Sequence, residues 1–150
     1  MQIQRLQTLF LLLAIACMVT FLFVPFGAWD VNVVSQIDPA WVNLTAKSFS
    51  AFLVPTIASV LLMVIAVFTF KKLPLQKSLV MLSVLLVIAI AGVVIYEMTL
   101  GFNYQVAGVS VKPVWSGGGL LIIAALVALI AAYRCICRDQ NLLRSYDRLR

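Results

Sequence analysis

The sequence predicts an all-α membrane protein, a four-transmembrane-helix bundle, from its composition, the length of its apolar blocks and the placement of its charges. Hydrophobic residues make up 64% of the 150 residues and charged residues only 11%, whereas soluble domains are about half apolar and about a quarter charged. The apolar residues fall into blocks of roughly twenty, the length that a helix needs to cross a hydrocarbon core of about 30 Å. We therefore expect residues 1–150 to form a single domain in a lipid bilayer.

Four apolar segments are predicted to cross the bilayer. The first loosens near Pro25 and Gly27 and is too long for the apolar part of a signal peptide, so we expect it to be retained. The second carries Pro55, which removes a backbone donor and is expected to kink its helix. A short basic link at 71–77 precedes the third, and a polar segment at 101–113 precedes the fourth. The predicted spans are residues 6–28, 49–70, 78–100 and 114–133.

Lysine and arginine are distributed unevenly between the two sides of the predicted membrane. Of the eleven, only Lys47 and Lys112 fall in the loops after the first and third spans. The other nine are Arg5, Lys71, Lys72, Lys77, Arg134, Arg138, Arg144, Arg148 and Arg150. Because positive side chains stay on the cytoplasmic side of short loops, both termini are predicted to be cytoplasmic.

The outer segment between the third and fourth spans has the alternation of a β-hairpin. Apolar and polar residues alternate over 102–106 and again over 109–112, and Ala107 and Gly108 separate the two runs. Residues 30–33 alternate more briefly. They are a candidate third strand that would extend the hairpin into a small extracytoplasmic sheet, because an isolated hairpin is only marginally stable.

Residue types that usually carry catalysis are scarce. Histidine is absent, and the five carboxylates are spread over loops and tail. Cys135 and Cys137 form a CxC pair, but a closed zinc site needs four ligands, so two reduced cysteines are favoured over a metal or redox role. We predict no catalytic, cofactor-binding or metal-binding residue, and no enzymatic activity.

The spans also lack the ionisable residues that line most transport pathways. Glu97 is the one acid near a membrane boundary, and we expect it to form an ion pair with Lys112 or Lys47 across the outer loops, in preference to a role in proton transfer. The polar residues within the spans are small hydroxyls, which are expected to bond the preceding helical turn. They are Thr20, Thr56, Ser59, Thr69 and Ser83.

Small residues recur at intervals of four in the last span. Ala124, Ala128 and Ala132 follow this spacing, which lets two membrane helices approach closely. We expect contact with the other spans of the same chain, and an interface with a second copy or another subunit is the alternative.

The tail, residues 134–150, is predicted to be an amphipathic cytoplasmic helix. Leu142, Leu143, Tyr146 and Leu149 follow helical spacing on one face. We favour simple anchoring of this helix at the membrane edge. The alternatives are that it lies along the anionic inner leaflet or docks to a cytoplasmic protein partner. The candidate interaction residues are Arg138, Asp139, Leu142, Leu143, Arg144, Asp147, Arg148 and Arg150.

Both ends of the chain carry a family resemblance. The opening residues 3–9 (IQRLQTL), and the tail pattern of Arg138, Asp139, Leu142–Ser145 and Asp147–Arg150, resemble the family of small four-helix inner-membrane proteins of Bacteroidota with the domain of unknown function DUF4293. The resemblance covers the whole chain in span order, although Gln140 stands where the family often has an acid. It implies a bacterial cytoplasmic (inner) membrane and no particular activity.

We therefore predict a multi-pass inner-membrane protein that acts through contacts. The leading hypothesis is a non-catalytic accessory, scaffold or assembly subunit of an envelope complex; the alternative is a small oligomeric transporter or channel. The expected partners are the lipid bilayer and either other membrane-protein subunits or further copies of the chain. Nucleic acid is not expected, because the basic residues lie at membrane edges.

Overall fold

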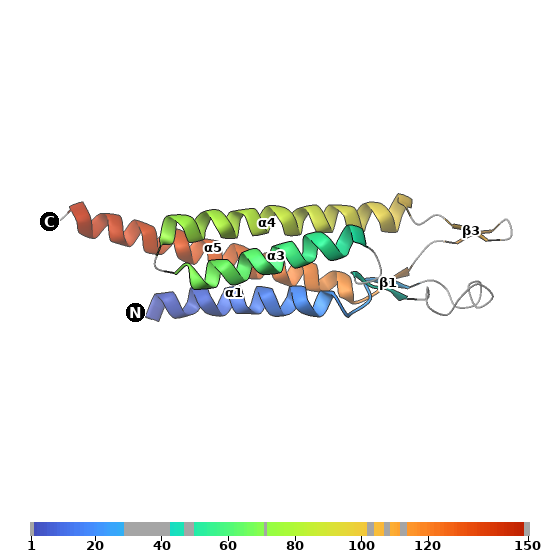
Figure 1. The fold of residues 1–150 in the computed structure, drawn as a ribbon, viewed down its shortest axis with the longest axis horizontal. Helices are drawn as coiled ribbons and strands as arrows, with labels where there is room; N and C mark the ends of the chain where they lie inside the picture. Colours follow the sequence, from blue (N-terminus) through green and yellow to red (C-terminus); the bar gives the residue numbers. More distant parts are fainter. Residues whose placement is uncertain are drawn as a thin grey trace.

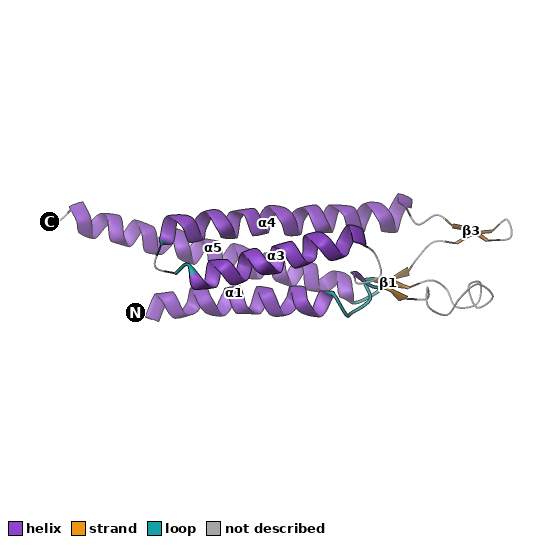
Figure 2. Ribbon diagram, viewed as in Figure 1, coloured by secondary structure: helices purple, strands orange, loops and turns teal. Residues whose placement is uncertain are grey.

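A computed structural model describes residues 2–28, 43–46, 50–70, 72–101, 104–106, 109–111 and 114–148 of the protein. The described chain is mostly helical (Figure 2). Its long helices are α1 (Gln2–Phe21), α3 (Ser50–Phe68), α4 (Leu73–Tyr96) and α5 (Gly118–Arg148), and the π-helix η3 (Glu97–Gly101) continues directly from α4. The long helices lie side by side and give the molecule an elongated shape (Figure 1).

The helices pack so that the chain termini share one end of the molecule. α5 packs against α1 and α4, and α3 packs against α4 and α1. α1 begins and α5 ends at the same end, where α3 is also linked to α4, and the strands lie at the opposite end (Figure 1). We call these the terminal end and the strand end.

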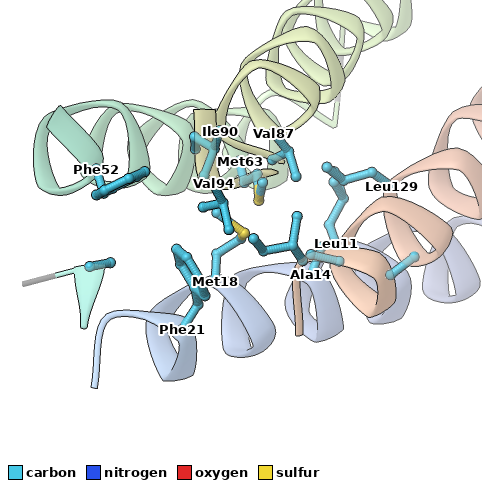
Figure 3. Close-up of a cluster of buried hydrophobic side chains, with 14 of the residues drawn as sticks. Leu11, Ala14, Met18, Phe21, Phe52, Met63, Val87, Ile90, Val94 and Leu129 are labelled. Carbon is cyan, nitrogen blue, oxygen red and sulfur yellow. The ribbon is translucent and has the colours of Figure 1, made fainter. Parts of the chain in front are cut away.

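The interior is built from one buried face on each helix. Buried residues recur every three or four positions, as expected of helices that bury one side. Figure 3 shows the centre of this core, formed by Leu11, Ala14, Met18 and Phe21 of α1, Phe52 and Met63 of α3, Val87, Ile90 and Val94 of α4, and Leu129 of α5. Towards the strand end, the ring of Phe26 lies between Phe21 and Phe52, with centroid distances of 5.9 and 5.2 Å.

Large apolar side chains also cover the outside of the helices. Leu9 of α1, Phe68 of α3, Leu85 of α4 and Leu120 of α5 are all more than half exposed, and Phe68 is 77% exposed. By length and composition, α4 and α5 are each sufficient to cross a membrane, and α1 and α3 contain shorter apolar stretches.

The strand end carries two small sheets. β1 (Gly27–Ala28) is the central strand of the first and pairs antiparallel with β2 (Asn43–Leu44) and β5 (Val114–Trp115). The second is the hairpin of β3 (Tyr104–Val106) and β4 (Val109–Val111), with Tyr104 opposite Val111. The predicted hairpin is confirmed. The candidate strand at 30–33 lies outside the described residues.

Several helix ends differ from the predicted spans. α1 ends at Phe21 rather than near Ala28, because the segment around Pro25 turns into β1. α4 begins at Leu73, with Pro74 in its first turn, where proline is favoured because no backbone donor is lost. α5 begins at Gly118 rather than at 114, because Val114–Trp115 form β5. It then runs without interruption to Arg148, so the fourth span and the predicted tail form one helix.

The hydroxyls within the predicted spans bond the preceding turn, as expected. Thr56 Oγ1 donates to the carbonyl oxygen of Phe52 at 2.6 Å, and Ser83 Oγ donates to that of Leu79 at 2.9 Å. Thr20, Ser59 and Thr69 make equivalent bonds. These hydroxyls serve the local backbone, and Pro55 lies within α3 beside one of them.

Candidate functional site

Buried polar side chains gather at the terminal end of the helices. Gln7 of α1 is 2% exposed, Gln76 of α4 is 1% exposed and Asp139 of α5 is 9% exposed. Each continues the buried face of its helix, because Gln7 precedes Leu11, Gln76 precedes Val80 and Asp139 follows Ile136 at helical spacing. The apolar interior therefore becomes polar at this end.

Gln7 and Asp139 join the first and last helices directly. The side-chain amide Nε2 of Gln7 donates a hydrogen bond to Oδ2 of Asp139, across 132 residues of sequence. A buried carboxyl group is costly unless it has hydrogen-bond partners, and the amide supplies one. This bond fixes α1 to α5 and holds the Asp139 carboxyl on the inner face of α5.

Gln76 differs from the other two residues. Its Oε1 atom is fully buried and accepts no hydrogen bond within the described part of the chain. A buried acceptor of this kind carries a desolvation cost of about 1–3 kcal/mol when it has no partner. Gln76 therefore carries a cost in stability that an apolar residue at the same position would not carry.

The neighbouring residue, Lys77, contacts α5. Its Nζ atom lies 5.5 Å from the centroid of the Tyr133 ring, within the range of a cation–π interaction. Because α4 begins at Leu73, Lys77 lies about one turn into that helix. The contact places the positive charge of Lys77 beside the end of the apolar part of α5, which is followed by Arg134.

An open groove of about 480 Å³ begins at this point and follows α5 towards its end. Its lining residues come from successive turns of the same helix, at positions 133, 134, 137, 138, 141 and 142. The guanidinium groups of Arg134 and Arg138 are on exposed residues, while Tyr133 and Cys137 are half-buried. The groove therefore combines two arginines with an aromatic and an aliphatic side chain.

A second cavity, of about 510 Å³, lies between α4 and the start of α5 at the strand end. Its lining is almost wholly apolar and includes Val94, Ile95, Trp115, Leu120 and Ile123. It offers contact to a hydrocarbon chain or an apolar side chain and no group suited to proton transfer.

The candidate tail residues do not share one face of α5. Arg138 and Leu142 are exposed, whereas Asp139 is buried against Gln7. The side chains of Leu143, Arg144, Asp147 and Arg148, and the whole of Arg150, lie outside the described part of the structure.

The other predicted site residues are placed as follows. Ala128 and Ala132 are buried among the chain's own helices, whereas Ala124 is exposed and Ala125 takes the buried position. Glu97 is half-buried in the first turn of η3, and its expected partners Lys112 and Lys47 are not among the described residues.

The thiols of Cys17, Cys135 and Cys137 are free and half-buried. Within the described residues, no three His, Cys, Asp or Glu side chains come together in a group that could hold a metal ion. The groups that the terminal end offers to a ligand are instead the positive charges of Lys77, Arg134 and Arg138 and the ring of Tyr133. Together they suit the binding of an anionic group.

Sequence reasoning missed the Gln7–Asp139 pair and the burial of Gln76. A signal was present in both cases, because each residue continues an apolar stripe at spacings of three and four residues. The partner of each polar residue could not be read from a single helix, since it depends on which helices become neighbours.

Comparisons with known proteins add one finding about this chain. No curated protein and no solved structure matches it. The model of the family described as "Domain of unknown function (DUF4293)" matches residues 3–149, nearly the whole chain, and includes both Gln7 and Asp139. The chain belongs to the DUF4293 family.

Proposed function

We propose that this protein is an integral membrane protein whose four long helices all cross the bilayer. The exposed apolar side chains on every long helix carry the proposal. Soluble proteins rarely expose contiguous apolar surface on this scale, whereas hydrocarbon is the matching solvent for it. The hydroxyls bonded within their own helices also fit this interpretation, because backbone and side-chain polar groups in a bilayer need partners within the protein.

The charges support an orientation with the terminal end in the cytoplasm. Every lysine and arginine among the described residues lies towards the terminal end, including Lys72, Lys77, Arg134 and Arg138. Positive charge is retained on the cytoplasmic side, so the strand end faces outward. A bacterial inner membrane is the compartment that the family resemblance implies, and we propose it for this protein.

Within that membrane, we propose a non-catalytic role as an accessory or assembly subunit of an envelope complex. The space between the helices is filled by apolar side chains. Among the described residues, the buried polar ones are hydroxyls bonded to the backbone and side chains at the terminal end. The features left for recognition are on the outside: the hairpin at one end and the groove on α5 at the other. Binding to other components is the function that such surfaces support.

Reporter fusions test the topology. A fluorescent protein that matures only in the cytoplasm, fused after Arg150, is expected to fluoresce, and alkaline phosphatase inserted between Ala107 and Gly108 is expected to be active. The reversed pattern would overturn the orientation, and a purified chain that stays monomeric without detergent would overturn the membrane proposal.

Crosslinking and purification of the endogenous protein test the role. Other envelope proteins are expected to copurify in mild detergent, and a chain that migrates alone without crosslinked partners would contradict the accessory function. A solute flux in proteoliposomes that is abolished by Glu97→Gln would replace it with transport.

A further inference from the structure

The exposed face of α5 changes character along its length. Towards the strand end it carries Leu120, Ile123, Val127 and Ile130, which are 69%, 59%, 63% and 48% exposed. The same face continues at helical spacing into Arg134 and then Arg138, both exposed. A continuous apolar stripe therefore runs into a basic groove with no change of helix face.

This order matches the structure of a phospholipid. Acyl chains fit the apolar stripe, and a negatively charged headgroup at its end would meet Arg134 and Arg138 in the groove of about 480 Å³. Guanidinium groups bind phosphate through two parallel N–H donors, and Asn141 adds an amide to the same lining. Because the stripe lies in the bilayer, a phospholipid in contact with it brings its headgroup directly to the arginines, whereas an acidic protein partner would use the arginines alone.

Two further contacts make this face positive. Lys77 lies over the ring of Tyr133, which lines the groove, and so adds a cation from α4 at the boundary between stripe and groove. Asp139 is the only acidic residue between positions 133 and 142, and its bond to Gln7 holds it on the buried face of α5. The Gln7–Asp139 bond thus keeps the carboxyl group out of the lining of the groove.

We propose that this face of α5 is a binding site for an anionic phospholipid, with the phosphate held between Arg134 and Arg138 and an acyl chain lying along Leu120–Ile130. The inference rests on the proposed function in one respect, because it requires the helices to lie in a bilayer. It adds a specific ligand: basic pockets at the cytoplasmic side of membrane helices bind anionic headgroups of this kind.

Lipid retention measured by native mass spectrometry tests the site. The full chain is purified in mild detergent with an equimolar mixture of phosphatidylglycerol and phosphatidylethanolamine, and the wild type is expected to retain phosphatidylglycerol preferentially. Arg134→Gln with Arg138→Gln is expected to weaken that retention at least about tenfold, because a hydrogen bond from a guanidinium group to a phosphate oxygen contributes a factor of about ten.

A matched control separates this site from general surface charge. Arg5→Gln with Lys72→Gln removes the same charge from the first turns of α1 and from the residue before α4, and neither residue lines the groove. This double variant is expected to change retention less than about twofold. Equal losses in the two double variants would overturn the inference, as would full retention in the arginine double variant.

The source of the phosphate is tested separately. Inorganic phosphate and glycerol 1-phosphate are expected to displace the lipid only weakly, because neither occupies the apolar stripe. Displacement at concentrations equal to those of the lipid would overturn the lipid assignment. The topology reporters distinguish the two proposals: an inserted chain without lipid preference defeats this inference alone, whereas a chain that is not inserted defeats the proposed function.

Discussion

The two ends of the helices are held together by different kinds of contact. At the strand end the contacts are between backbone groups: β1 pairs with β2 and β5, and the amide of Gly118 donates to the carbonyl oxygen of Pro25 at 3.1 Å. At the terminal end they are between side chains, the Gln7–Asp139 hydrogen bond and the Lys77–Tyr133 contact. A substitution that adds a bulky side chain is therefore expected to disturb the strand end most. A substitution that removes a hydrogen-bonding group is expected to disturb the terminal end most.

The largest effect is expected where a side chain would separate the two backbones at the strand end. In Gly118→Ala, the added Cβ would lie 2.4 Å from the carbonyl oxygen of Pro25 and 2.8 Å from its carbonyl carbon. Neither atom belongs to a flexible side chain, so α5 or the segment before β1 must shift. We expect the free energy of unfolding in detergent to fall by about 2–3 kcal/mol, measured by thermal or denaturant unfolding.

The neighbouring glycine provides the control for this change. A Cβ on Gly117 would meet no atom within 4 Å, so Gly117→Ala is expected to change stability by less than about 0.5 kcal/mol. If both alanine variants are equally stable, the close approach of Gly118 to Pro25 does not hold the strand end together.

The strand end could be predicted from the sequence only in part. The hairpin was predicted because alternation over 102–112 is long enough to recognise. The sheet of β1, β2 and β5 was not, since its strands are two residues long and two residues carry no periodicity. The three consecutive glycines at 117–119 are visible in the sequence, but only the packing shows that the middle one is in closest contact.

At the terminal end, the effect of replacing Asp139 on the free energy of unfolding is expected to depend on whether the new side chain can accept a hydrogen bond. Asp139→Ala removes the acceptor for Gln7 and leaves a buried amide without a partner, so we expect a loss of about 1–3 kcal/mol in the free energy of unfolding. Asp139→Asn is expected to lose less, because its side-chain oxygen can still accept the bond from Gln7.

A double-mutant cycle isolates the pair from the individual residues. Gln7→Leu combined with Asp139→Leu is expected to be more stable than the sum of the two single changes predicts, by about 1 kcal/mol, because no buried polar group is left unpaired. Strict additivity of the two single variants would mean that the hydrogen bond does not couple α1 to α5.

The helix faces were more predictable than the contacts between them. Spacing places Ala128 and Ala132 on one face, and both are buried, yet the stripe drifts so that Ala125 replaces Ala124 within the core. Straight helices have 3.6 residues per turn, so an interval of four leaves the buried face after a few turns. The partners of Gln7 and Gln76 depend on helix neighbours, which no single helix specifies.

The smallest expected effect concerns Gln76 and has the opposite sign. Gln76→Met replaces a buried acceptor without a partner by an apolar side chain of similar length, so we expect stability to rise by about 1 kcal/mol. Lys72→Met, on an exposed residue just before α4, is the control and is expected to change stability by less than about 0.5 kcal/mol.

A gain for Gln76→Met together with a loss of copurifying partners would show that the polar group serves recognition at the expense of stability. A loss of stability would instead mean that the Gln76 carbonyl is already satisfied in the folded protein, and the terminal end would then be as fully bonded as the strand end.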